Sequence, residues 1–193
     1  MQITNCKLQI RAGVRVLRLC SPDGTNRLTR AFVPELTAAV HELARDSQPL
    51  IITGNEKFFS AGADLHEIAG LGAVEALEFS RMGQELMNAI AGFPAPVCAA
   101  IHGYCMGGGL DLALACHGRV VSPHAIFGHR GAALGLITGW GGMQRLPRLV
   151  GKSHALQMFV AAEKVSAQQA LRIGLVEAVA EDPIAWAVDT LSS

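Results

Sequence analysis

A short apolar run that passes into a glycine-rich loop decides the fold of this chain: residues 97–109 are Val-Cys-Ala-Ala-Ile-His-Gly-Tyr-Cys-Met-Gly-Gly-Gly. Residues 97–101 have the length and apolar character of a strand that is buried in a parallel sheet. The last three glycines lead into a predicted helix over 109–116, and the positive end of a helix dipole favours an anion. This segment therefore predicts a strand–loop–helix unit whose small residues allow a ligand to approach the backbone closely.

A second segment of similar design lies earlier in the chain. Residues 50–53 predict another buried strand that ends at Gly54, and a loop follows from Asn55 to Asp64. Ligands bind beyond the carboxyl ends of strands in open α/β sheets, where backbone N–H groups can hold an oxygen that gains negative charge. Glycines that only serve tight turns explain either loop alone, whereas two such loops favour a ligand site.

The rest of the chain indicates an α/β fold with mainly parallel strand pairing, because predicted strands, loops and helices repeat in that order. Ser153 and Ser166 are expected to cap two short helices. The other expected elements are a hairpin of residues 6–11 and 14–20, helices over 30–46, 73–91 and 140–150, and strands over 118–122, 125–128 and 175–179.

Composition excludes several classes of protein. Sixteen basic residues balance sixteen acidic residues, so the chain lacks the basic excess of a nucleic-acid binder. No apolar run approaches the roughly 20 residues of a membrane span, and residues 1–5 do not resemble a secretory signal. Five cysteines without a Cys-x-x-Cys pair suggest reduced thiols in a cytoplasmic protein. The seven histidines are dispersed, so no metal is expected.

Two motifs resemble the signatures of the crotonase superfamily, which contains the enoyl-CoA hydratases and isomerases. They are Phe-Ser-Ala-Gly-Ala-Asp-Leu at residues 59–65 and Ala-Ala-Ile-His-Gly-Tyr-Cys-Met-Gly-Gly-Gly-Leu-Asp-Leu-Ala at residues 99–113. Further matches include Phe127-Gly128, the stretch 141–146 and the stretch 170–176. The resemblance covers nearly the whole chain in the familiar order.

The resemblance implies a crotonase-like spiral of ββα repeats over residues 1–180, a short C-terminal tail over 181–193, and assembly into a homotrimer or hexamer. It implies an acyl-CoA thioester as substrate, with coenzyme A as part of that substrate and no separate cofactor. The backbone N–H groups of Ala63 and Gly108 would hold the thioester oxygen as an enolate forms. Residues expected to bind the substrate or its coenzyme A part are Ala61, Gly62, Ala63, Asp64, Leu65, His66, Gly107 and Gly108.

The expected acid–base residues depart from the hydratase pattern. Hydratases of this family use two glutamates around a water molecule, and the matching positions here are Asp111 and Gly131. Asp111 falls in the first turn of the predicted helix, so it is either a partner of the helix dipole or an acid–base group. Gly131 cannot transfer a proton; it serves a backbone turn or makes room for a bulkier substrate or a bound anion. Ordinary enoyl-CoA hydration is therefore expected to be weak or absent.

Other side chains leave alternatives open. His66 either touches coenzyme A or is a solvated loop residue, and Trp140 either lines an acyl pocket or belongs to the core. Glu67, His129 and Arg130 are weaker candidates for proton transfer or for binding a carboxylate substrate. Thr138 stands where family members that form a naphthoate ring carry an aspartate.

Two functions follow from these residues. The first is an acyl-CoA lyase or isomerase that stabilises a thioester enolate, with fatty acid metabolism as the setting by analogy with the family. The second is a non-catalytic acyl-CoA-binding or assembly subunit that has lost the catalytic glutamates. Family members commonly continue for more helices beyond the position of Val179, and those helices support the trimer and cover the acyl pocket.

Overall fold

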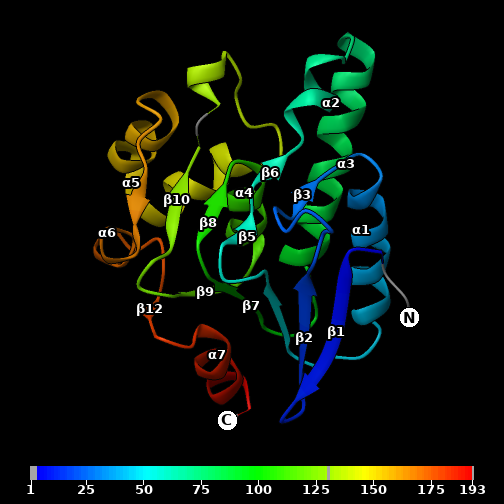
Figure 1. Ribbon diagram of the computed structural model, residues 1–193, viewed down its shortest axis with the longest axis vertical. Coiled ribbons are helices and arrows are strands. Elements are labelled where there is room, and N and C mark those ends of the chain that lie inside the picture. Colours follow the sequence, from blue (N-terminus) through cyan, green and yellow to red (C-terminus); the bar gives the residue numbers. More distant parts are fainter. Residues whose placement is uncertain (1–3, 130, 193) are drawn as a thin grey trace.

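A twisted sheet with helices on both faces forms the base of the molecule (Figure 1). The computed structural model describes residues 4–129 and 131–192. Its largest sheet has the strand order β1-β2-β4-β7-β9-β12. Only β1 runs antiparallel to its neighbour, so the predicted parallel pairing is confirmed. The strands are β1 (Cys6–Arg11), β2 (Val14–Leu19), β4 (Leu50–Thr53), β7 (Val97–Ile101), β9 (Gly118–Val121) and β12 (Ala178–Val179).

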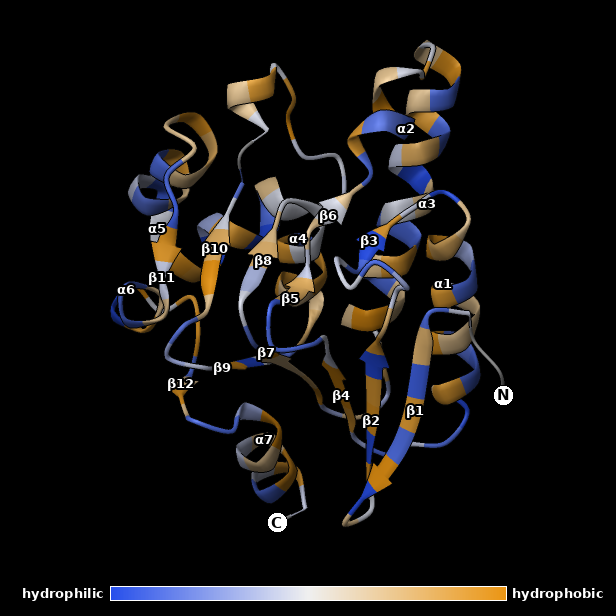
Figure 2. Cartoon of the chain, in the orientation of Figure 1, coloured by the Kyte–Doolittle hydropathy of each residue, from blue (hydrophilic) through white to orange (hydrophobic). Residues whose placement is uncertain are grey.

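Two hydrophobic cores explain why the central strands β4 and β7 are buried at every position. Ile52 and Ala99 belong to the larger core, together with residues of α1 (Phe32–Leu43) and α3 (Ala73–Ala91). Ile51 and Cys98 point to the other face, where α7 (Pro183–Leu191) covers them. Because successive side chains alternate between faces, a strand with a core on each side has no polar face. Figure 2 shows the contrast between β4 and the edge strand β1, along which hydrophilic and hydrophobic residues alternate.

A smaller layer of strands lies above the carboxyl ends of the large sheet. Its order is β11-β10-β8-β5, and β3 pairs separately with β6. These strands are β3 (Arg27–Leu28), β5 (Phe58–Ser60), β6 (Gly62–Ala63), β8 (Tyr104–Met106), β10 (Ile126–Gly128) and β11 (Val165–Ser166). The loops predicted after β4 and β7 thus contribute β5 and β8, which pair in parallel and bring the two motifs side by side.

The remaining helices connect these layers. They are α2 (Leu65–Ala69), α4 (Gly108–Ala115), the 3₁₀ helix η1 (Ala132–Leu134), α5 (Gly142–Val160) and α6 (Ala167–Arg172). Within the described residues no helix is both long and apolar enough to cross a membrane.

Four details of the predicted elements need correction. The segment 55–64 is not a simple loop, since it contains β5 and β6. The strand expected over 175–179 is limited to β12, and the helix expected over 140–150 continues to Val160 past a break at Gly151. That glycine, rather than a cap at Ser153, interrupts the helix, because its φ of 79° is not helical. The cap predicted at Ser166 is confirmed: its side chain accepts a hydrogen bond from the amide of Gln169.

Candidate active site

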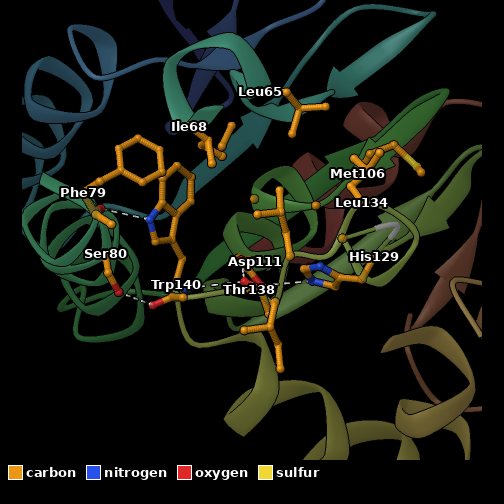
Figure 3. A pocket seen from close by; sticks show the side chains of 18 of the residues that line it. Leu65, Ile68, Phe79, Ser80, Met106, Asp111, His129, Leu134, Thr138 and Trp140 are labelled. Atoms are coloured by element: carbon orange, nitrogen blue, oxygen red, sulfur yellow. Dashed lines mark hydrogen bonds and ion pairs between the residues drawn. The ribbon is translucent and has the colours of Figure 1, made fainter. Parts of the chain in front are cut away.

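The two glycine-rich loops face a cavity of about 320 Å³ (Figure 3). Its walls are largely apolar, and Leu65, Ile68 and Phe79 come from α2 and α3. Leu134 and Ile137, from η1 and the segment after it, also line the cavity and are largely exposed to solvent. An apolar cavity of this size with a few polar groups is typical of a small-molecule site. Among the described residues, four polar side chains line it: Ser80, Asp111, His129 and Thr138.

Two backbone amides lie together at one wall of this cavity. Gly108 is the first residue of α4, so its N–H has no acceptor within the helix. A Cβ placed on Gly108 would lie 3.3 Å from the amide nitrogen of Ala63, which shows how closely β6 approaches the start of α4. Both residues line the cavity. The two residues therefore lie close together beside the N-terminus of α4, and the positive end of a helix dipole favours an anion.

Gly62 makes this approach possible. Its φ is +90°, and a Cβ at this position would lie 2.5 Å from the carbonyl oxygen of Met106 and 2.8 Å from the nitrogen of Gly108. Any larger residue would therefore push β6 away from α4. The glycine of the first motif serves the packing of the two loops and does not line the cavity itself.

Asp111 lies one turn further along α4 and is 1% exposed. The hydroxyl of Thr138 donates a hydrogen bond to its Oδ2, and the Nε2 atom of His129 lies 3.1 Å from its Oδ1. His129 is itself 4% exposed and packs against Phe159 with 5.0 Å between ring centroids. Figure 3 shows the three polar side chains meeting beside the cavity. Each oxygen of the carboxylate thus has its own partner.

The start of a second helix, α5, lies beside the side chain of Asp111. Gly142 is the first residue of α5, and a Cβ placed on it would lie 2.0 Å from Oδ1 of Asp111 and 3.1 Å from Nε2 of His129. The carboxylate therefore lies in the first turn of α4 and against the first residue of α5. Helix N-termini favour negative charge by roughly 0.3–1 kcal/mol each. This surrounding compensates for the burial of a carboxylate, which is otherwise costly.

Trp140 closes the cavity behind Gly108. Its indole is 3% exposed, packs on Phe79 with 5.1 Å between ring centroids, and donates from Nε1 to the carbonyl oxygen of Phe79 at 3.1 Å. A Cβ placed on Gly108 would lie 2.6 Å from the Cζ3 atom of this indole ring. The two alternatives for Trp140 are therefore not exclusive, because this residue belongs to the core and lines the cavity.

The structure brings most of the predicted site residues together. Those that line the cavity are Ala61, Ala63, Leu65, Gly107, Gly108, Asp111 and Gly131. Asp64 and His66 do not line it: the carboxylate of Asp64 caps α2 by accepting a hydrogen bond from the amide of His66. Gly131 has a φ of −57° and precedes η1, so it fits the predicted backbone turn and presents no side chain to the cavity. Arg130 lies outside the described residues.

Two of the polar side chains carried little signal in the sequence. In the sequence His129 is a weak candidate, and Thr138 stands out only as the position of a missing aspartate. Both come close to Asp111 from 18 and 27 residues away, so no local spacing could predict the contact. One feature of the sequence does point to His129: it directly follows the Phe127-Gly128 pair. This pair ends strand β10, and the next residue lines the cavity.

Comparison with known proteins gives relatives that all point to one family. A sequence profile described as enoyl-CoA hydratase/isomerase matches residues 9–185. A probable enoyl-CoA hydratase of Bacillus subtilis is 41% identical over 172 residues, which cover 88% of this chain and 66% of the relative. A short-chain-enoyl-CoA hydratase of Clostridium acetobutylicum is 36% identical over 184 residues, which cover 94% of this chain and 70% of the relative. The chain thus spans about two thirds of the length of these relatives.

Solved structures agree with the sequence matches. The structure of DspI from Pseudomonas aeruginosa superposes with a TM-score of 0.91 and 36% identity, covering 98% of this chain and 79% of that one. The enoyl-CoA hydratase of Bacillus anthracis gives a TM-score of 0.92 and 33% identity, covering 97% and 75%. On the fold, the profile match and these relatives together, the chain belongs to the enoyl-CoA hydratase/isomerase family, the crotonase superfamily that its two loop motifs indicate.

Proposed function

We propose that this protein binds an acyl-CoA thioester and stabilises its enolate, as an enzyme of the hydratase/isomerase type. The observation that carries the proposal is the close approach of the Ala63 and Gly108 amides at the wall of an apolar cavity. An oxygen held there lies beside the start of α4, and the buried carboxylate of Asp111 follows one turn further along. This supplies an anion site and a proton acceptor near the same substrate atoms. No cofactor is needed for such chemistry.

Two substitutions at residue 108 test the anion site. Gly108→Ala and Gly108→Pro both introduce a Cβ that meets Trp140, but only the proline removes the backbone N–H. The comparison between these variants therefore isolates the N–H group from the steric change. We expect turnover of acyl-CoA substrates to be roughly 10²–10³-fold lower in the proline variant than in the alanine variant. Circular dichroism first establishes that both fold; equal turnover in the two would contradict the assignment of Gly108.

A second function, an acyl-CoA-binding or assembly subunit without catalysis, is favoured by one observation. Gly131 presents no side chain at the cavity wall, at the position where hydratases of the family carry a glutamate. Titration calorimetry with butyryl-CoA and an assay of crotonyl-CoA consumption separate the two functions. Binding without turnover on a panel of acyl-CoA thioesters favours the subunit, whereas turnover favours the enzyme.

Assembly into a homotrimer or hexamer is part of the proposal. It is supported by large apolar side chains that α5 leaves exposed, among them Leu156 and Val160, which are 62% and 67% exposed. Light scattering at micromolar concentration measures the assembly directly, and a monomer would contradict this part of the proposal.

A further inference from the structure

We propose that His129 and Thr138 are positioning residues that divide the two oxygens of the Asp111 carboxylate between a fixed role, at Oδ1, and a working role, in which Oδ2 carries the proton. The proposal rests on the proposed function, since it requires an acyl-CoA whose enolate is held by the amides of Ala63 and Gly108. It assigns the reaction class: proton transfer at carbon, with or without a shift of the double bond, rather than addition of water.

His129 gives Oδ1 the fixed role. Its Nε2 atom lies 3.1 Å from Oδ1, and both side chains are almost completely buried. An ionised carboxylate only accepts hydrogen bonds, so the imidazole donates through Nε2–H to Oδ1. Gly142 lies against the same oxygen, because a Cβ added there would be 2.0 Å from Oδ1 and 3.1 Å from Nε2 of His129. Oδ1 thus faces an imidazole and the start of α5, and these neighbours favour a fixed role for this oxygen.

Thr138 gives Oδ2 the working role. Its hydroxyl donates to Oδ2 while the carboxylate is charged. A hydroxyl can also accept, so the same contact survives when Oδ2 carries a proton and the hydroxyl rotates. An imidazole N–H has no such freedom, because it remains a donor in both states. The pair of neighbours therefore tolerates a proton on Oδ2 and disfavours one on Oδ1.

The proton balance closes with this one carboxylate. Oδ2 removes a proton from the α-carbon of the bound thioester; the C–H bond breaks, an O–H bond forms, and the electron pair passes to the thioester oxygen between the two amides. Return of the proton to the same carbon regenerates the substrate. Where the substrate has a double bond between the β and γ carbons, return to the γ-carbon moves it to the α,β position. Neither path needs water or a second carboxylate, which agrees with the absence of a side chain at Gly131.

Two matched pairs of variants test the division of roles. His129→Phe keeps a ring but removes the donor, whereas His129→Gln places an amide N–H where Nε2 was. Thr138→Val keeps the shape but removes the hydroxyl, whereas Thr138→Ser keeps it. The control is His124→Gln, an exposed histidine on the loop between β9 and β10 and outside the cavity. Asp111→Asn removes the proton carrier.

Two reactions report proton transfer without hydration. The first is incorporation of deuterium into butyryl-CoA in D₂O, detected by mass spectrometry, in which the proton on Oδ2 exchanges with solvent before a deuteron returns to the carbon. The second is conversion of 3-hexenoyl-CoA to 2-hexenoyl-CoA. Loss of a correctly placed base costs about 10²–10⁴-fold, and a misplacement of about 1 Å costs about 10²-fold. We expect the phenylalanine and valine variants to lose about 10²-fold in rate. The glutamine and serine variants should remain within about tenfold of the parent. The dissociation constant for butyryl-CoA should change by less than about threefold in all four.

The outcomes separate the two levels of the proposal. Parental rates in the phenylalanine and valine variants, or activity that survives Asp111→Asn, overturn the division of roles and leave acyl-CoA binding intact. A parent protein that binds butyryl-CoA but catalyses neither reaction also overturns it and favours the binding subunit. Absence of binding contradicts the proposed function itself. Equal losses in both members of each matched pair would show that His129 and Thr138 act through packing alone.

Discussion

Substitution of Gly142 by alanine is the sharpest perturbation of the site that a single methyl group can make. Gly142 is the first residue of α5 and its φ lies outside the left-handed region, so alanine fits the local backbone. Helix propensity alone favours the change by up to about 1 kcal/mol. The expected effect therefore comes from what the methyl group meets, which is Oδ1 of Asp111 at 2.0 Å and Nε2 of His129 at 3.1 Å.

The size of the effect follows from these distances. Ordinary contacts of a Cβ atom begin at 3.4 Å, so Oδ1 and the new methyl group must separate by about 1.4 Å. Overpacking of a buried site costs about 1–3 kcal/mol, and the helix propensity offsets part of it, which leaves a loss of about 0–2 kcal/mol in the free energy of unfolding. For a chain of this length that is a fall of at most about 4–8 °C in Tm. A misplacement of about 1 Å costs about 10²-fold in rate, so the rate suffers more than the fold.

The assay compares deuterium exchange into butyryl-CoA with the thermal midpoint, and Gly118→Ala is the matched control. A Cβ at Gly118 meets nothing within 4 Å, and this residue begins β9, away from the cavity. We expect the control to keep the parental rate and Gly142→Ala to lose about 10²-fold while folded. A folded Gly142→Ala protein with the parental rate would refute the reasoning that the placement of the Asp111 carboxylate governs proton transfer.

Three further predictions follow from the same structure. Gly83→Ala places a Cβ 2.1 Å from Nε1 of Trp140; we expect a loss of about 1–3 kcal/mol and a changed tryptophan fluorescence spectrum, and an unchanged spectrum and Tm would contradict the fit. Asp111→Glu adds a methylene where both carboxylate oxygens already have close neighbours, so it should destabilise the protein by a similar amount and leave crotonyl-CoA hydration weak; restored hydration would be the contrary result. Burial raises the pKa of the Cys98 thiol to about 12 and that of Cys116 further above its usual value of 9.0. Because the folded-state pKa values are raised, each thiol contributes its full stabilisation of the folded protein below about pH 9. Above about pH 9 the free energy of unfolding falls by about 1.4 kcal/mol per pH unit for each thiol. Urea unfolding of the parent and of Cys98→Ala at pH 8 and pH 10 measures this loss.

The sequence predicted those parts of the fold that depend on local pattern. The strands β4 and β7 were found because burial on both faces leaves an unbroken apolar run. The strands β5 and β6 were missed because three and two residues are too few to show any periodicity. The break in α5 was also missed: Gly151 lies inside a stretch whose helical pattern continues on both sides.

The same division holds at the site. The place of Ala63 and Gly108 at the cavity wall was predictable, because it depends only on the loop that carries each residue. The neighbours of Asp111 were not, because strand β10 and the segment after η1 reach it from elsewhere in the chain. His117 is a further residue whose role depends on a contact between distant parts of the chain. Its Nδ1 atom accepts from the amide of Val97 at 2.9 Å, which ties the end of α4 to the start of β7.

The departures from the two-glutamate pattern depend on one another in space. A carboxylate that is one methylene shorter allows the start of α5 to approach until Gly142 touches it. The imidazole of His129 then meets Oδ1, and Thr138 reaches Oδ2. Each of these contacts would be disrupted by restoring the longer side chain alone. With Asp111 as the proposed proton carrier, these contacts make a repacked proton-transfer site, with its own neighbours for the carboxylate, rather than a hydratase site that lacks two groups.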